Sequence, residues 1–146
     1  MVANKRKMFS RLKQELGSVN VVSSASVRDA RFPTWDLSDA IHKSPNFSTA
    51  YVVISVQGLQ VQGHGLTFTE GRGTEVVISA IQALLSLLVG KPLVKICTDF
   101  GTFWHSLTNE SQLRWIRPEK GAVYLAVAAI VNALWDIWTK IEEKLV

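Results

Sequence analysis

The chain is poor in cysteine: it holds one, Cys97, among 146 residues. A single thiol excludes an intramolecular disulfide framework and is typical of a reducing compartment, so we expect an intracellular protein, either cytoplasmic or mitochondrial. No Cys or His stands near Cys97 at the spacing of metal ligands. We therefore expect Cys97 to be a small buried hydrophobic residue.

Motifs of the common catalytic and metal sites are also missing. The sequence has no HExxH, no GxGxxG, no P-loop and no GxSxG elbow, and His42, His64 and His105 each stand alone. The segment Gly71-Arg72-Gly73-Thr74 resembles an anion-binding turn but lacks the lysine and the spacing of a P-loop. We interpret it as a turn in which glycines join a strand to a helix.

Residues 19–146 carry no net positive charge. The chain has 16 basic and 12 acidic residues; residues 1–18 contain five of the basic and one of the acidic, which leaves 11 of each in residues 19–146. A neutral domain gives no electrostatic reason to bind nucleic acid, so we predict no nucleic-acid partner. Residues 1–18 are interpreted as a basic extension, either a mitochondrial presequence or a solvated segment, ahead of one domain at 19–146.

No apolar run reaches the 20 or so residues that a membrane span needs. The longest extends from Ala122 to Leu134 with Tyr124 and Asn132 inside it, and Asp136 follows closely. We therefore predict a buried helix and no membrane partner. An apolar stripe and a more polar stripe run along this helix; they consist of Val123, Val127, Ile130, Leu134, Ile137 and Ile141, and of Tyr124, Ala128, Asn132, Asp136 and Lys140.

Strand patterns precede helix patterns along the chain. Strands are predicted within residues 19–32, at 50–56 in the centre of the sheet, and at 61–69, and the short turn at 57–60 makes them an antiparallel meander. Helices are predicted from the N-cap Thr74 to the stop at Gly90 and Pro92, within 94–107, and from Pro118 or Glu119 to about Lys144. This order predicts an α+β domain, with a three-stranded antiparallel sheet followed by a helical bundle.

Three separated motifs carry a resemblance to a known family. They are SVRDARFPT at 26–34, GHGLTFTEGRGTEVV at 63–77, and QLRWIRPEKGAVYLAVAAIVNALWDIW at 112–138. Together they resemble the amino-terminal region of the L-fuconate dehydratases, acid-sugar dehydratases of the mandelate racemase-like enolase superfamily with mitochondrial members in animals. The resemblance extends over residues 26–140, and Arg117 replaces a glycine that is usual in the last motif.

The resemblance implies the amino-terminal capping domain of that superfamily. A full-length family enzyme dehydrates L-fuconate to 2-keto-3-deoxy-L-fuconate, using Mg²⁺ held by carboxylates of a carboxy-terminal barrel and a lysine and a histidine as acid and base. This chain ends at Val146, near where that barrel would begin. We therefore expect it to lack the catalytic residues and the Mg²⁺ ligands, to be inactive alone, and to need a barrel domain as its partner.

The family's substrate loop corresponds to residues 34–48. The resemblance implies that Ser38 and Asp39 contact hydroxyl groups of the sugar acid, and that Phe47 stands where the family has a tyrosine. Without the resemblance, Ser38 and Asp39 would be interpreted as an Asx-type turn. The loop is shorter than in the family, which affects the expected substrate more than the expected fold.

A second hypothesis concerns a different class of protein. The same domain, without a barrel, can act as a stand-alone, non-catalytic module that binds a partner through the surface that would face the barrel. The oligomeric state is not predicted under either hypothesis.

Overall fold

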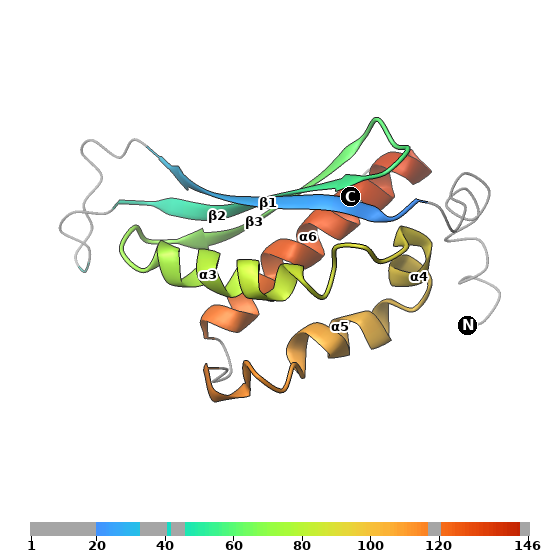
Figure 1. Ribbon diagram of the computed structural model, residues 1–146. Helices are drawn as coiled ribbons and strands as arrows, with labels where there is room; N and C mark the ends of the chain where they lie inside the picture. The colour runs from blue at the N-terminus through green and yellow to red at the C-terminus, as the bar shows by residue number, and fades with distance from the viewer. Residues whose placement is uncertain (1–19, 33–40, 42–45, 117–120, 144–146) are drawn as a thin grey trace.

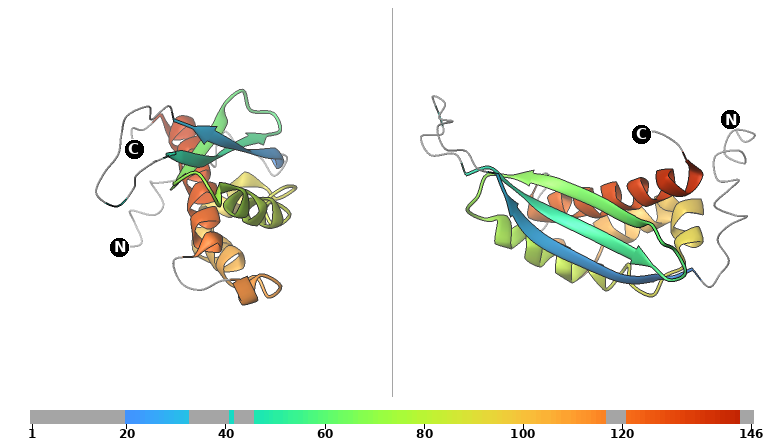
Figure 2. Two further views of the ribbon diagram at one scale, coloured as in Figure 1. Left: turned by 90° about the vertical axis from the view of Figure 1, so that its left-hand side faces the viewer. Right: turned by 90° about the horizontal axis from the view of Figure 1, so that it is seen from above.

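The computed structural model describes residues 20–32, 41, 46–116 and 121–143. A three-stranded sheet forms one layer, and helices cover one of its faces only (Figures 1 and 2). The elements in chain order are β1 (Val22–Arg31), β2 (Ser48–Val56), β3 (Gln62–Thr69), α3 (Thr74–Leu85), α4 (Leu93–Thr98), α5 (Phe100–Thr108), the 3₁₀ turn η1 (Arg114–Ile116) and α6 (Ala122–Glu142). The predicted α+β order, with an antiparallel meander followed by helices, is confirmed.

Strand β2 lies in the centre of the sheet and pairs antiparallel with β1 and β3. Its β-branched residues alternate between the faces, as the period of a strand requires. Ala50, Val52, Ile54 and Val56 point to the helical layer and are all buried. The prediction of a central strand is confirmed, although β2 begins two residues earlier than predicted, at Ser48.

Helix α6 crosses beneath the sheet and supplies much of the core (Figure 1). Every residue of its predicted apolar stripe is buried, and α3 packs beside it on the same face of the sheet. Burial of such side chains contributes roughly 1.5–3 kcal/mol each relative to exposure. Cys97 lies in this core, where burial raises the pKa of its thiol to about 12, so the thiol remains protonated at neutral pH.

Two glycines allow α6 to approach strand β3 closely. A Cβ atom at Gly63 or at Gly65 would lie closer than 3.0 Å to the carbonyl oxygen of Ala133 or of Ala129, respectively. Side chains of any size at these positions would push the helix away from the strand. The sequence prediction of close backbone approach at these glycines is confirmed.

The polar stripe of α6 binds the open edge of β3. The Asp136 carboxylate accepts a hydrogen bond from the His64 backbone N–H at 2.7 Å, and Asn132 Nδ2 donates to the Leu66 carbonyl at 3.0 Å. Lys140 Nζ donates to the Gln62 carbonyl at 2.9 Å and to Asp136 at 2.6 Å. An edge strand whose backbone groups are satisfied in this way is not available to pair with another chain.

Helix α6 is also long and apolar enough to cross a membrane by length and composition alone. Of its most apolar 18-residue window, 56% is buried inside the fold. A core helix passes the same test, so this is weak evidence for a membrane span, and the absence of a membrane partner stays a prediction.

Three predicted details of the helices are wrong. Gly73, with φ of 91°, is the N-cap of α3, and Thr74 is its first helical residue. The Thr74 hydroxyl does not cap the helix because it bonds within a buried network described below. Helix α3 ends at Leu85, followed by turns up to Gly90. The single helix predicted within 94–107 is two helices, since the Asp99 side chain accepts a hydrogen bond from Thr102 N and starts α5 anew.

We predict that Gly65→Ala destabilises the fold by about 2–3 kcal/mol, because the added methyl group meets the backbone of α6, which cannot rotate away as a side chain could. Chemical denaturation of the 146-residue chain measures this. Gly101→Ala in α5 is the matched control: nothing lies within 4 Å of its Cβ position, so we expect no loss of stability. Equal stability of the two variants would contradict the close approach.

Candidate functional site

The predicted substrate loop joins the end of β1 to the start of β2. Ser38 and Asp39 lie outside the described residues, and so does His42. Phe47 is described and is half-buried, with its ring centroid 5.5 Å from that of Phe68 on β3. Its carbonyl oxygen accepts a hydrogen bond from Phe32 N at 2.9 Å, so the two ends of the loop are tied together.

The turn from β3 into α3 lies at the same end of the sheet as this loop (Figure 1). Gly71 and Gly73 both have positive φ, 89° and 91°, a conformation that favours glycine. The sequence interpretation of this segment as a glycine-assisted turn from strand to helix is confirmed. Segments more than 20 residues apart therefore meet at one end of the sheet, which we call the loop end.

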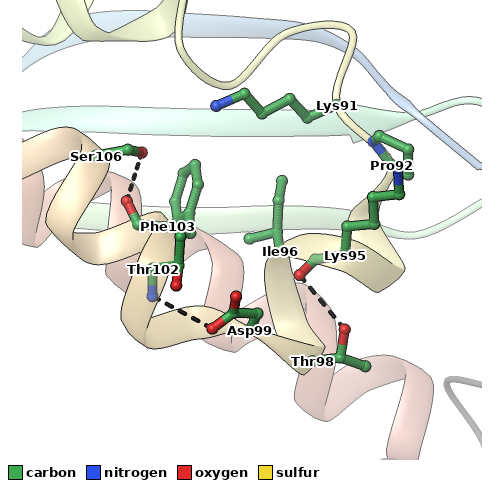
Figure 3. Close-up of a pocket in the computed structure, with 9 residues that line it drawn as sticks. All are labelled: Lys91, Pro92, Lys95, Ile96, Thr98, Asp99, Thr102, Phe103 and Ser106. Atoms are coloured by element: carbon green, nitrogen blue, oxygen red, sulfur yellow. Dashed lines mark hydrogen bonds between the residues drawn. The ribbon is translucent and has the colours of Figure 1, made fainter.

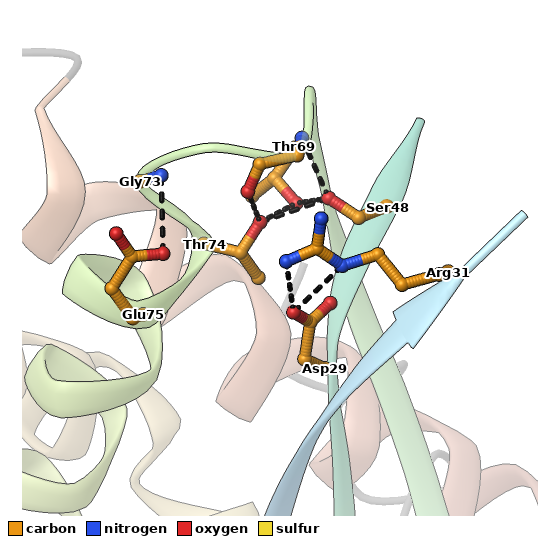
Figure 4. A network of polar contacts seen from close by, with 8 residues as sticks. Asp29, Arg31, Ser48, Thr69, Gly73, Thr74 and Glu75 are labelled. Atoms are coloured by element: carbon orange, nitrogen blue, oxygen red, sulfur yellow. Dashed lines mark hydrogen bonds and ion pairs between the residues drawn. The ribbon is translucent and has the colours of Figure 1, made fainter. Parts of the chain in front are cut away.

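The hydroxyl groups of Ser48, Thr69 and Thr74 form a hydrogen-bonded triad at the loop end (Figure 4). Ser48 Oγ lies 2.7 Å from Thr69 Oγ1 and 2.8 Å from Thr74 Oγ1, and the two threonine hydroxyls lie 2.8 Å apart. Gly71 N donates to Ser48 Oγ at 2.8 Å, and Thr74 Oγ1 donates to the Gly71 carbonyl at 2.7 Å. Buried hydroxyls are costly unless bonded, so this triad fixes the turn against the start of β2.

A charged group lies beside the triad. The Arg31 guanidinium donates from Nε at 2.8 Å and from Nη2 at 2.5 Å to one oxygen of Asp29 (Figure 4). These hydrogen bonds raise the pKa of Arg31, and the charges of Asp29 and Glu75 act in the same direction. Glu75 in turn accepts a hydrogen bond from Gly73 N at 3.1 Å. The loop end thus carries a permanent cation that is bonded to Asp29 and lies within electrostatic range of Glu75.

This arrangement fits binding rather than bond breaking. Guanidinium N–H groups and carboxylate oxygens donate to and accept from hydroxyl groups, which suits a polar, polyhydroxylated ligand. Sequence reasoning did not identify Asp29 or Arg31 as part of a site; it included Ser48 only as the last residue of the substrate loop and interpreted Thr74 as part of a structural turn. The available signal was the presence of charged and hydroxyl side chains at the ends of all three strands.

The described residues do not fit a magnesium site. Within residues 20–32, 41, 46–116 and 121–143, no three His, Cys, Asp or Glu side chains come together as possible metal ligands. Two of the histidines have local partners: His64 Nδ1 lies 2.7 Å from Tyr51 Oη on the sheet face away from the helices, and His105 stacks edge-on against Trp104. Both are structural in this arrangement.

Comparison with known proteins finds homologues for most of the chain. Mitochondrial enolase superfamily member 1 of Xenopus laevis is 50% identical over 127 residues, and the L-galactonate dehydratase of Hypocrea jecorina is 46% identical over 116 residues. These matches take in 84% and 77% of this chain but 28% and 26% of the relatives. The chain therefore spans less than a third of the length of the relatives that it matches. No model of a protein family matches the chain.

Solved structures share the fold. The crystal structure of human mitochondrial enolase superfamily member 1 matches with a TM-score of 0.81 and 48% identity, over 88% of this chain and 30% of that one. The L-talarate/galactarate dehydratase of Salmonella typhimurium, liganded with Mg and L-lyxarohydroxamate, matches with a TM-score of 0.68 at 16% identity, over 84% and 31% of the two chains. The second match shows the fold alone.

We predict that Thr74→Val destabilises the domain by about 1–3 kcal/mol, because it removes hydrogen bonds and leaves the hydroxyl of Ser48 buried with fewer partners. Thermal and denaturant unfolding measure the change. Ser79→Ala on the same helix is the control, since its exposed hydroxyl bonds only the Glu75 carbonyl, and we expect a change within about 0.5 kcal/mol. Similar losses in both variants would show that the triad does not hold the turn.

Proposed function

Because this chain is a homologue of the enolase superfamily and carries the fold of its amino-terminal capping domain, we propose that it caps the active site of an acid-sugar dehydratase. Its loop end faces the substrate in this proposal, and a barrel domain supplies the chemistry. The single observation that carries the proposal is the homology, near 50% identity, over almost all of the described fold.

The name of one relative supports a sugar acid as the substrate class. That relative, 46% identical over 116 residues, is named an L-galactonate dehydratase. Galactonate carries a hydroxyl group on each of several carbons. Our finer proposal is L-fuconate, dehydrated in the complete enzyme to 2-keto-3-deoxy-L-fuconate; it rests on the motifs at 26–34, 63–77 and 112–138.

The loop end offers groups that suit the distal hydroxyls of such an acid. Arg31 keeps guanidinium N–H groups beyond those that bind Asp29, and its side chain is 44% exposed. We propose that Ser38 and Asp39, on the loop that starts three residues after Arg31, add a hydroxyl group and a carboxylate to this set. Phe47, whose ring is tilted against that of Phe68, offers an apolar surface where a tyrosine would add another hydroxyl group.

The metal and the acid and base belong, in this proposal, to the barrel and not to this chain. Mg²⁺ would stabilise the charge that develops when a proton is removed beside the substrate carboxylate. The described residues offer no donor set for that ion. What this chain does is bind and orient the substrate and keep water away from it, so we propose that it is inactive alone.

Uncovered apolar side chains support a partner domain. Phe32, Leu66 and Phe68 are each about half exposed, and Trp115 is 83% exposed. Leu66 and Phe68 lie on the sheet face that no helix covers (Figure 2). The two exposed apolar side chains on this uncovered sheet face indicate an interaction surface, whereas Trp115 lies apart from them, in η1. The same observation supports our second candidate, a stand-alone module that binds a different protein through this surface.

We propose a mitochondrial location, because the vertebrate relatives are named mitochondrial proteins. Residues 1–18 would then act as a presequence. A cytoplasmic location is the alternative, and import of a fluorescent fusion of residues 1–25 distinguishes the two.

The loop contact can be tested in a chimera in which this chain replaces the homologous region of the Hypocrea jecorina enzyme. Asp39→Ala should raise KM for the sugar acid about tenfold, as expected for a lost hydrogen bond of ~1.5 kcal/mol, and leave kcat unchanged. Asp36→Ala, which removes the same charge from the same loop, is the control and should leave KM unchanged. If the two variants behave alike, Asp39 does not contact the substrate.

A further inference from the structure

A cavity of about 350 Å³ lies away from the loop end, between the turn that follows α3 and the corner of α4 and α5. Figure 3 shows the Lys91 side chain extending above Phe103 and Ile96. Nine residues line the cavity: Lys91, Pro92, Lys95, Ile96, Thr98, Asp99, Thr102, Phe103 and Ser106. Its size is within the range of small-molecule sites.

The walls of this cavity are held in place by the fold. Val22 N donates to the Lys91 carbonyl at 3.0 Å, and Gly90 N donates to the Val22 carbonyl at 2.8 Å, so the turn is fixed to the start of β1. On the other side, Asp99 caps α5 by accepting from Thr102 N. A ligand would therefore enter a preformed space and would not have to order it.

The floor of the cavity is apolar. Ile96 and Phe103 belong to the hydrophobic core and expose only 3% and 5% of their surface. The Lys91 ammonium lies 5.6 Å from the centroid of the Phe103 ring, at the distance of a cation–π contact. An apolar group in the cavity would lie beside these two side chains, next to a positive charge.

The rim determines the charge of the ligand. It holds two ammonium groups, Lys91 and Lys95, and one carboxylate, Asp99. The hydroxyls of Thr98 and Ser106 already donate to the backbone carbonyls of Val94 and Phe103. The lysines are thus the main donors left for a ligand, and the excess of one positive charge favours a monoanion over a dianion.

The cavity is separate from the proposed substrate site. Its turn is bonded to Val22 at the first residue of β1, whereas Arg31 at the loop end is the last. Nine residues of extended strand separate them, roughly 30 Å. A ligand here does not touch the substrate of the proposed dehydratase.

We propose that this cavity is a binding site for a small monocarboxylate with an apolar body, such as an aryl-alkanoate. The apolar body lies against Phe103 and Ile96, and the carboxylate accepts hydrogen bonds from Lys91 and Lys95. Sugar acids do not suit the site, because their hydroxyl groups would be buried against an apolar floor without partners.

The test is an NMR titration of the 146-residue chain with 3-phenylpropionate. We expect saturable amide shifts centred on Ile96, Thr102 and Phe103, with a dissociation constant on the order of 1 mM for a ligand of this size. The neutral analogue 3-phenylpropan-1-ol should bind at least about fivefold more weakly, as should L-galactonate. Equal binding of the alcohol, or shifts centred elsewhere, would overturn the proposal.

Charge variants provide the second readout. Lys91→Met and Lys95→Met keep the aliphatic stem and should each weaken 3-phenylpropionate about three- to fivefold. Arg28→Met is the matched control, since it removes one positive charge from the exposed residue on β1 and should leave binding unchanged. Asp99→Asn keeps an oxygen that can cap α5 and should strengthen the binding of phenylsuccinate, a dianion, about threefold. Lysine variants that bind like the Arg28 variant would overturn the proposal.

Discussion

The close approach of α6 to β3 is the constraint on which the rest of this fold depends. Gly63 and Gly65 remove the side chains that would separate the helix from the strand. At that short distance the polar stripe of α6 reaches the backbone of β3, so that Asn132, Asp136 and Lys140 satisfy groups that an edge strand otherwise exposes. Two features that look unrelated in the sequence, a pair of glycines and a row of polar residues 70 positions later, form one contact.

The same contact fixes the geometry of the loop end. Because α6 holds β3 in register, the end of β3 enters the turn at Gly71 in a defined position. The hydroxyl triad then ties that turn to the first residue of β2. The loop after β1 is tied across its ends by the bond between Phe32 and Phe47. A binding loop carried on a rigid scaffold in this way suits the specificity role that we propose.

The sequence was most informative where local pattern decides structure. The short β-branched run at 50–56 predicted the central strand, and the two stripes predicted both the buried face of α6 and the existence of a separate polar face. Prediction failed where a distant contact decides. Threonine is a residue type that favours the N-cap position, but the Thr74 hydroxyl bonds to Ser48, 26 residues away. Gly73 is the N-cap residue instead.

The residues that meet at the loop end could not be predicted from local sequence patterns, because distant contacts bring them together. Asp29 and Arg31 look like ordinary members of a strand in the sequence, and only the assembled fold brings Arg31 within electrostatic range of Glu75. Asp99 interrupts a segment whose apolar spacing reads as one helix, because its capping bond to Thr102 outweighs the continuity of the pattern. Ser38 and Asp39 lie outside the described residues, and their role stays a prediction.

Complementation in trans tests the central claim, that this chain caps a dehydratase barrel, most directly. The L-galactonate dehydratase of Hypocrea jecorina is prepared without its homologous amino-terminal region, and this chain is added with Mg²⁺ and L-galactonate. The account predicts dehydration that rises and saturates with the concentration of this chain, and none from either part alone. If the corresponding domain of the human relative restores activity and this chain does not bind the barrel, the account is contradicted.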